Sequence, residues 1–281
     1  MTMSFPSTAD HTGRAEDVVG VELTIDGVLV LAEALGLADF PTSLGIRPNI
    51  PQEDVREAVR QQVQQDLTAQ GVMDAHGRPH PAVATMIHTV SAPDRMLEGR
   101  WWRRDVGGVM VRFTICRKGE GHVIAVRDDD LLVLQRVTPQ IGLAGMVTCV
   151  LGEAGPATVE PLTGVAADLA HCTTAEQLAD FGIDPHSADV YARITGNPSA
   201  WVEIIAGQRM PDGTPTQTTV AAGVVDSEQG RVVSAPRRIA GELYGSFLPG
   251  TAENLQRCLD ELLQFLPAGA WFDDGTRCSN E

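Results

Sequence analysis

Ser246 and Cys172 carry the side chains that could act as nucleophiles in catalysis. Ser246 lies in the segment Gly245-Ser246-Phe247, which lacks the second glycine of the G-x-S-x-G turn that presents a catalytic serine. Cys172 directly follows His171, and adjacent side chains on a helix point in different directions, so we expect no Cys/His pair here. Spacing alone places no third group beside Ser246 or His171. A hydrolase or transferase that uses one of them in a cleft therefore remains only an alternative.

Patterns typical of metal or phosphate binding are weak. His76 and His80 are four residues apart, but Gly77 and Pro79 interrupt the segment, so the spacing is not that of a helical ligand pair. Residues 128–130 are three consecutive aspartates, whereas a calcium loop spreads its oxygen ligands over a longer segment; they predict a polar hairpin turn. No G-x-x-x-x-G-K-[ST], G-x-G-x-x-G or H-E-x-x-H motif occurs. We therefore expect no catalytic residue, no metal and no cofactor.

The composition narrows the class of protein further. The chain has 37 acidic and 21 basic residues among 281, a formal net charge of -16 that repels nucleic-acid backbones and acidic membrane surfaces. The longest uncharged apolar segment, from Ile141 to Gly152, is about half of the roughly 20 residues that span a bilayer. The five cysteines are odd in number and contain no C-x-x-C pair, and the first residues do not resemble a secretory signal. We expect a cytoplasmic globular protein that binds no nucleic acid.

The segment GRWWRRD, Gly99–Asp105, concentrates three arginines and two of the four tryptophans in this acidic chain. Side chains alternate along a strand, so Trp101 is predicted to face the core and Trp102 the opposite face, between arginines. Trp102 could stack under a neighbouring guanidinium group on a solvated face. The same face, or the turn at residues 103–108, could instead contact a partner, because Trp and Arg are enriched in binding hot spots. Both interpretations are open on these residues alone.

The elements around this segment follow the same order in both halves of the chain. Apolar periodicity, caps and turn residues predict, in the first half, a strand at VGVELT, a short helix capped by Asp26, helices at about 51–70 and 80–91, and strands at 95–104, 109–117, 122–127 and 131–137. The second half predicts a strand and short helix in TVEPLTGVAADLA, a capping box at Thr173 and Glu176, a helix from Asp184-Pro185 to about Gly196, strands at 200–210, 216–226 and 231–239, and an amphipathic helix capped by Thr251. The turns are too short for parallel crossovers, so the strands are expected to be antiparallel.

The repeated order predicts a diverged duplication with an α+β fold, in which an antiparallel central sheet has helices packed on one face and is followed by a C-terminal helical region. We expect a disordered tail at 1–17, an N-terminal half at 18–152, a C-terminal half at 153–272 and a flexible C-terminus at 273–281. The two halves are expected to form one intertwined domain. Two independent domains joined near Gly152 to Pro156 are the alternative.

Three segments resemble the EspG family of mycobacterial ESX, or type VII, secretion-associated proteins: VGVELTIDGVLVLAEALGLADFP, GRWWRRDVGGVMVRF and GELYGSFLPGTAENL. The resemblance covers about residues 18–272. It implies a quasi-two-fold α+β fold and a cytosolic, non-enzymatic chaperone. Such a chaperone binds PE-PPE heterodimers at the tip of the PPE helical bundle, keeps them soluble and delivers them to the ESX machinery.

The resemblance also implies which surface binds the partner: the central sheet, the loop between its second and third strands, and the C-terminal helical region. In this sequence the corresponding residues are Trp102, Arg103, Arg104, Asp105, Val106, Gly107, Gln208, Arg209, Ser227, Arg231, Leu243, Phe247 and Leu248. Release of the cargo requires reversible binding, so we expect a partly polar interface. A homodimer of the free protein is possible, and a homo-oligomeric scaffold is a further alternative function.

Overall fold

The computed structural model describes residues 19–47 and 53–272. The tails expected at 1–17 and 273–281 lie outside the described residues. The chain divides into two compact units, which we call unit 1 (Met1–Asp94 with Arg112–Thr138) and unit 2 (Arg95–Val111 with Pro139–Glu281). These units differ from the expected halves, because one strand and one helix of the first half belong to unit 2.

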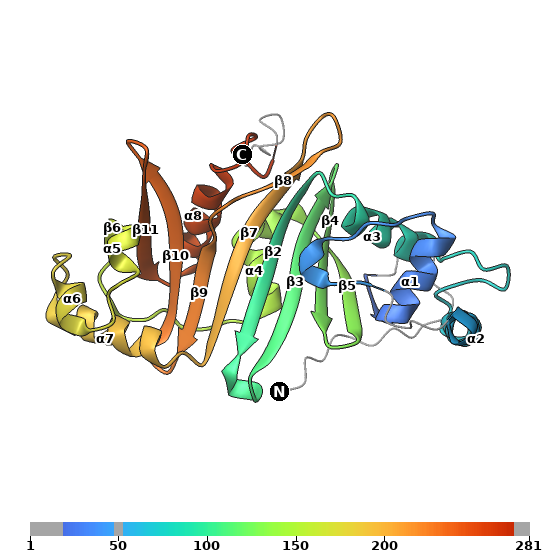
Figure 1. The fold of residues 1–281 in the computed structure, drawn as a ribbon, viewed down its shortest axis with the longest axis horizontal. Helices are drawn as coiled ribbons and strands as arrows, with labels where there is room; N and C mark the ends of the chain where they lie inside the picture. Colours follow the sequence, from blue (N-terminus) through green and yellow to red (C-terminus); the bar gives the residue numbers. More distant parts are fainter. Residues whose placement is uncertain (1–18, 48–52, 273–281) are drawn as a thin grey trace. The chain divides into compact units, whose positions relative to one another are not determined.

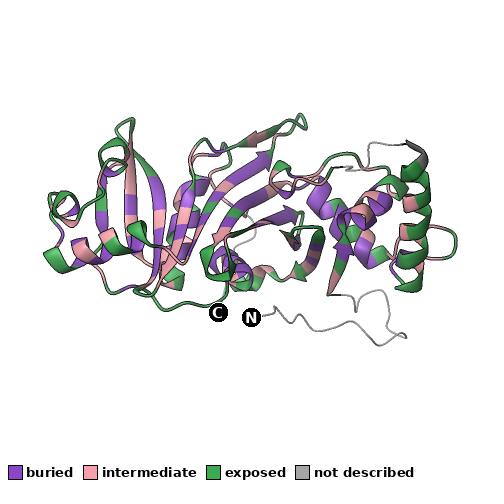
Figure 2. Cartoon of the chain, turned by 60° about the horizontal axis from the view of Figure 1, so that its bottom comes forward, coloured by how far each residue is buried: buried purple, intermediate pink, exposed green. Residues whose placement is uncertain are grey.

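Unit 1 consists of an antiparallel sheet and three α-helices among its described residues. Its elements are β1 (Gly20–Thr24), α1 (Ile25–Ala34), η1 (Thr42–Leu44), α2 (Glu53–Ala69), α3 (Pro81–Ser91), β3 (Val109–Lys118), β4 (Gly121–Asp128) and β5 (Leu131–Val137). The strand order is β1-β5-β4-β3, and α1 and α3 pack on β5 and β4. Figure 2 shows that the outer face of α2 is exposed along most of its length, as its glutamine-rich sequence predicts.

The helix starts in unit 1 follow from short polar side chains. The α1 helix begins two residues earlier than expected, because Thr24 caps it: its Oγ1 accepts a hydrogen bond from the backbone N–H of Gly27 at 3.0 Å. Asp26, the expected cap, lies within the first turn, so that prediction was wrong. The α3 helix begins at Pro81 after a cap by His80, as the sequence indicates.

Unit 2 contains the remaining strands and helices of the described chain. Its elements are β2 (Arg95–Arg103), η2 (Arg104–Val106), η3 (Pro139–Ile141), α4 (Gly142–Leu151), β6 (Leu162–Val165), α5 (Ala166–Leu169), α6 (Ala175–Ala179), α7 (Pro185–Gly196), β7 (Ala200–Arg209), β8 (Pro215–Gln217), β9 (Ala222–Ser227), β10 (Gly230–Ile239), β11 (Glu242–Pro249) and α8 (Ala252–Leu263). The strand order is β2-β7-β9-β10-β11-β6, with β8 paired to β7, and the pairings are antiparallel (Figure 1).

Two strand predictions and one cap in unit 2 were wrong. The strand expected at 216–226 is two strands, β8 and β9, and β11 was missed altogether. The capping box of α6 uses Thr174 and Gln177 rather than Thr173 and Glu176. The caps of α7 and α8, Asp184 and Thr251, are confirmed.

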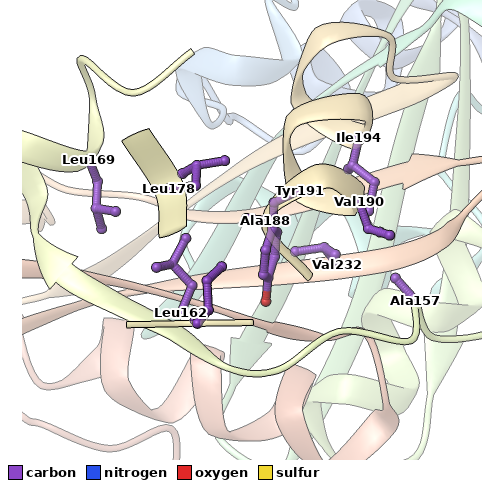
Figure 3. Close-up of a cluster of buried hydrophobic side chains, with 10 residues drawn as sticks. Ala157, Leu162, Leu169, Leu178, Ala188, Val190, Tyr191, Ile194 and Val232 are labelled. Atoms are coloured by element: carbon purple, nitrogen blue, oxygen red, sulfur yellow. The ribbon is translucent and has the colours of Figure 1, made fainter. Parts of the chain in front are cut away.

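Helices flank both faces of β10 in unit 2. Arg237 forms an ion pair with Glu261 of α8, so this face of the strand points toward α8. Val232 has the opposite parity along the strand and packs in a cluster with Tyr191 of α7 and Leu162 of β6 (Figure 3). The α+β class with an antiparallel sheet is confirmed, but the expectation that helices cover one face does not hold for this strand.

Candidate partner-binding surface

The turn between β2 and β3 requires two glycines. After the short helix η2, Gly107 and Gly108 have φ values of 93° and 79°, in the left-handed region that side chains disfavour. Gly107 donates a hydrogen bond to the carbonyl of Arg104 at 3.2 Å, and Gly108 donates to the carbonyl of Arg103 at 2.9 Å. A Cβ atom at Gly108 would lie 3.0 Å from Cζ2 of Trp102, so the indole ring lies directly against this glycine.

An ion pair and an indole ring fix the first basic side chain of the turn. The guanidinium of Arg103 lies 4.6 Å from the ring centroid of Trp101 and pairs with Asp105 at 2.8 Å. The hydrogen bond from Arg103 is the main cause that lowers the pKa of the Asp105 carboxyl below its ordinary value. A cation-π contact on Trp102 was one of the two open interpretations. It forms on Trp101 instead, because residues two apart on a strand share a face.

The turn is attached to the segment that precedes β7. The backbone N–H groups of Arg104 and Asp105 both donate to the carbonyl of Ser199, at 2.9 and 3.1 Å. The guanidinium of Arg104 also donates to Oδ1 of Asn197 at 2.5 Å. These contacts hold the turn in one position relative to the end of α7 and the start of β7.

Apolar side chains are exposed around the turn. Val106 is 44% exposed and Val109 is 38% exposed. Trp102 is half-buried and lies opposite Trp201 of β7, which is also half-buried, so the two indoles share one face of the sheet. The sequence did not reveal this pair, because about 100 residues separate Trp102 from Trp201 along the chain. The register of β2 on β7 brings Trp102 next to Trp201.

Six of the expected partner-binding residues, Trp102 to Gly107, are therefore brought together, and we call them the turn surface. Ser227 lies at the same end of unit 2, because Ala200 pairs with Asp226 at the end of β9. Its hydroxyl donates to the carbonyl of Gly230 at 3.2 Å within the β9–β10 turn.

Arg231 is also near this end, but its side chain is only 4% exposed. It donates two hydrogen bonds to the carboxylate of Asp226, at 2.6 and 2.8 Å, and a third to the carbonyl of Gly152 at 3.0 Å. A guanidinium with these partners is not available to another protein. We therefore leave Arg231 out of the contact surface.

Gln208 and Arg209 lie at the other end of β7, roughly 30 Å along the strand from Ala200 at about 3.3 Å per residue. Gln208 is buried, and its Oε1 accepts a hydrogen bond from the backbone of Ala268 at 3.0 Å. Arg209 is exposed and donates to the carbonyl of Gly213 at 2.8 Å. The structure does not bring this pair to the turn surface.

The three β11 residues are mostly internal. Leu248 is buried. Phe247 packs edge-on against Tyr191, with ring centroids 6.3 Å apart, and its carbonyl accepts a hydrogen bond from the Tyr191 hydroxyl at 3.1 Å. Leu243 is half-buried and pairs with Arg238, seven residues along β10 from the Asp226–Arg231 pair. A direct partner contact by these three residues remains a prediction.

The nucleophile candidates have structural contacts. Ser246 is buried in β11, and its hydroxyl is 3.0 Å from that of Thr163 in β6. Cys172 donates its thiol to the carbonyl of Asp168 at 3.3 Å. In the part of the chain that the structure describes, no group of three or more His, Cys, Asp or Glu side chains could hold a metal ion. Over those same residues, no helix is both long and apolar enough to cross a membrane.

Comparisons with known proteins agree over most of the chain. The sequence model of the EspG family matches residues 24–261. The chain is 67% identical to the ESX-1 secretion-associated protein EspG1 of Mycobacterium tuberculosis (96% of each chain), and 29% identical to the ESX-3 secretion-associated protein EspG3 of Mycolicibacterium smegmatis (90% of this chain, 89% of the other). Its fold matches that of the type VII secretion system chaperone EspG5 of M. tuberculosis, solved in complex with a PE25-PPE41 dimer. The TM-score is 0.72 at 18% identity, over 90% of this chain and 98% of the other.

Proposed function

The chain belongs to the EspG family, and from this premise we propose that it is a cytosolic chaperone that binds a PE-PPE heterodimer at the tip of the PPE subunit and delivers it to a type VII secretion system. We infer that the system is ESX-1. This is supported by identities of 62–67% to ESX-1 relatives, against 29% to ESX-3 relatives. The fold shared with a chaperone solved on a PE-PPE dimer supports the class of partner.

The turn surface is the observation that carries the proposal. It presents an exposed valine, a half-buried tryptophan and arginines on a turn that is fixed to the start of β7. Rigid aromatic and arginine side chains next to apolar area are typical of interaction hot spots, because they lose little entropy when a partner binds. The set is unusual in a chain with a net charge of -16.

A binding role explains the charge of the rest of the molecule. An apolar tip on a secreted helical bundle would associate with other copies of itself in water. A chaperone with a large net charge, bound over this tip, keeps the complex soluble. We propose that binding is the whole activity, since Ser246 is paired with Thr163 inside the sheet rather than presented on a surface.

The test is co-expression with PE-PPE pairs from the same genome, followed by size-exclusion chromatography and titration calorimetry. Val106→Asp places a charge on the turn surface, and the expected result is at least roughly tenfold weaker binding, the usual size of a hot-spot loss. The matched control is Val55→Asp on α2, which changes an equally exposed valine (42%) in unit 1 and is expected to bind like the wild type.

Three outcomes are informative. Failure of the wild-type chain to bind any pair would overturn the chaperone function. Equal binding by the Val106→Asp variant would retain that function but move the contact away from the turn surface. Light scattering on the free chain, measured in the same experiment, decides whether it is a homodimer before cargo binds.

A further inference from the structure

One backbone carbonyl accepts two hydrogen bonds from the turn surface. Ser199 accepts hydrogen bonds from the N–H groups of both Arg104 and Asp105. Ser199 in turn donates twice to the carbonyl of Asp226 in β9, from its N–H at 2.8 Å and from its hydroxyl at 2.9 Å. Ser199 therefore connects the turn to the end of β9.

The side chain of Asp226 is fixed by a buried cation. Its carboxylate accepts two hydrogen bonds from Arg231, whose side chain is 4% exposed while that of Asp226 is 21% exposed. A bidentate contact of this kind fixes the orientation of the carboxylate as well as its position, which the single ammonium group of lysine does not do.

Arg231 is itself anchored by its main chain. Its N–H donates to the carbonyl of Gly155 at 2.8 Å, and its carbonyl accepts from the N–H groups of Ala157 and Gly250, at 2.9 and 2.8 Å. A Cβ atom at Gly250 would lie 2.3 Å from Cγ of Arg231, so only glycine allows this approach. The segment between α4 and β6 and the start of α8 therefore meet at one arginine.

We propose that Ser199, Asp226 and Arg231 form a positioning network that holds the turn surface in its binding conformation without contacting the cargo. Hydrogen bonds to the side chain and to the carbonyl of Asp226, and to the carbonyl of Ser199, link Arg231 to the amides of Arg104 and Asp105. Arg231 in turn is bonded to the segment between α4 and β6. A turn held in advance binds more tightly, because less conformational entropy is lost on association. The expected gain in cargo affinity rests on the proposed function, whereas the expected gain in order of the turn does not.

Hydrogen exchange at the amides of Arg104 and Asp105, measured residue by residue by NMR without cargo, tests the network. Ser199→Ala removes one hydrogen bond to Asp226, and Arg231→Lys removes the bidentate contact. Both changes are expected to speed exchange at the two amides by roughly two- to tenfold, the effect of about one hydrogen bond. Ser199→Thr keeps the hydroxyl and is expected to restore exchange to within about twofold of the wild type.

The matched control is Ser246→Ala. It also removes one serine hydroxyl and one hydrogen bond within unit 2, but in β11, away from the network. It is expected to leave exchange at Arg104 and Asp105 unchanged. Unchanged exchange in both Ser199→Ala and Arg231→Lys, or equal acceleration by Ser246→Ala, would overturn the proposal.

Cargo binding separates this inference from the proposed function. If the wild type binds a PE-PPE pair, Arg231→Lys is expected to weaken binding by roughly tenfold, mainly through faster dissociation. Faster exchange with unchanged cargo affinity would show that the network holds the turn but does not serve binding, which would contradict the proposal. If no pair binds the wild type, the function fails, while the exchange result still decides whether the network positions the turn.

Discussion

Trp101 and Trp102 are neighbours in the chain, but their side chains lie on opposite faces of β2. Trp101 is 4% exposed, and within residues 19–47 and 53–272 its indole N–H has no hydrogen-bond partner. The burial of the ring indicates that it packs in the core. Trp101→Ala is expected to lower the free energy of unfolding by about 3 to 5 kcal/mol through the cavity it leaves. Trp102→Ala, at a half-buried position, is expected to lower the free energy of unfolding by about 1 kcal/mol and to weaken cargo binding.

Urea denaturation followed by tryptophan fluorescence, with calorimetric titration of the cargo, measures both changes. A similar loss of stability in the two variants would mean that the sheet has no free face at Trp102. That result would remove the aromatic part of the turn surface.

His122 is expected to make the stability of the fold depend on pH. It is buried, which is the main cause that lowers its pKa below the ordinary value of 6.5; nearby Arg117 acts in the same direction, and a hydrogen bond to the Glu120 carbonyl opposes it. Above pH 6.5 the imidazole is neutral in both the folded and the unfolded chain. As the pH falls below 6.5, the unfolded chain takes up the proton first, so the folded state loses stability.

The expected result is a larger drop in the thermal midpoint of the wild type between pH 7.5 and 5.5 than of a His122→Gln variant. Differential scanning calorimetry at the two pH values measures it. Parallel drops in the two proteins would assign the acid sensitivity to other groups.

The loop of the β10–β11 hairpin contains backbone strain at Ala240. Ile239 pairs with Glu242, so the loop is Ala240-Gly241, with φ values of 48° and 90°. Alanine is unfavourable in this left-handed conformation, whereas Asp129 in the β4–β5 hairpin, with φ of 50°, is a residue type that tolerates it. Ala240→Gly or Ala240→Asn is expected to raise the free energy of unfolding by about 0.5 to 1 kcal/mol, measured by urea denaturation. A loss of stability in both variants would rule out strain at this turn.

Local patterns in the sequence predicted most elements and failed where the competing signals are similar. The strands of the first half were predicted from alternation and glycine turns, within one residue at most ends. Thr24 and Asp26 are both good capping residues, so the sequence could not show which one the chain uses. The strand β11 contains Gly245 and ends at Pro249, which weakens its strand pattern.

In the candidate surface, too, the sequence predicted the local features and missed the contacts between residues far apart in the chain. The turn at 103–108 is local, and the spacing of arginine, valine and glycine residues predicted it. Trp201 and Ser199 are about 100 residues further along the chain, and they meet the turn only through the register of β2 on β7. Arg231 was expected on the surface, because an arginine in a strand next to a glycine turn does not reveal that the arginine is buried and paired with the carboxylate of Asp226.

The boundary expected near residue 152 does not coincide with the boundaries of the two compact units. All nine residues of β2 pair with β7, so a strand from the expected N-terminal half belongs to the sheet of unit 2. The helix α4, also from the first half, packs against α8. These two elements contribute the buried side chains Leu97, Trp101, Leu143, Met146 and Val147.

A chain cut at the expected boundary should therefore fold only when both parts are present. Residues 153–281 expressed alone lack β2 and α4, so β7 has an open edge and α8 loses the helix that packs against it. We expect no cooperative thermal transition for this fragment. Residues 1–152 and 153–281, co-expressed as separate chains, are expected to copurify. The complex is expected to show a cooperative thermal transition. Trp101→Ala in the first fragment serves as the control, because it weakens the same packing and should reduce the yield of the complex. A cooperative transition in 153–281 alone, with the circular dichroism of folded β-sheet, would instead establish two independent domains.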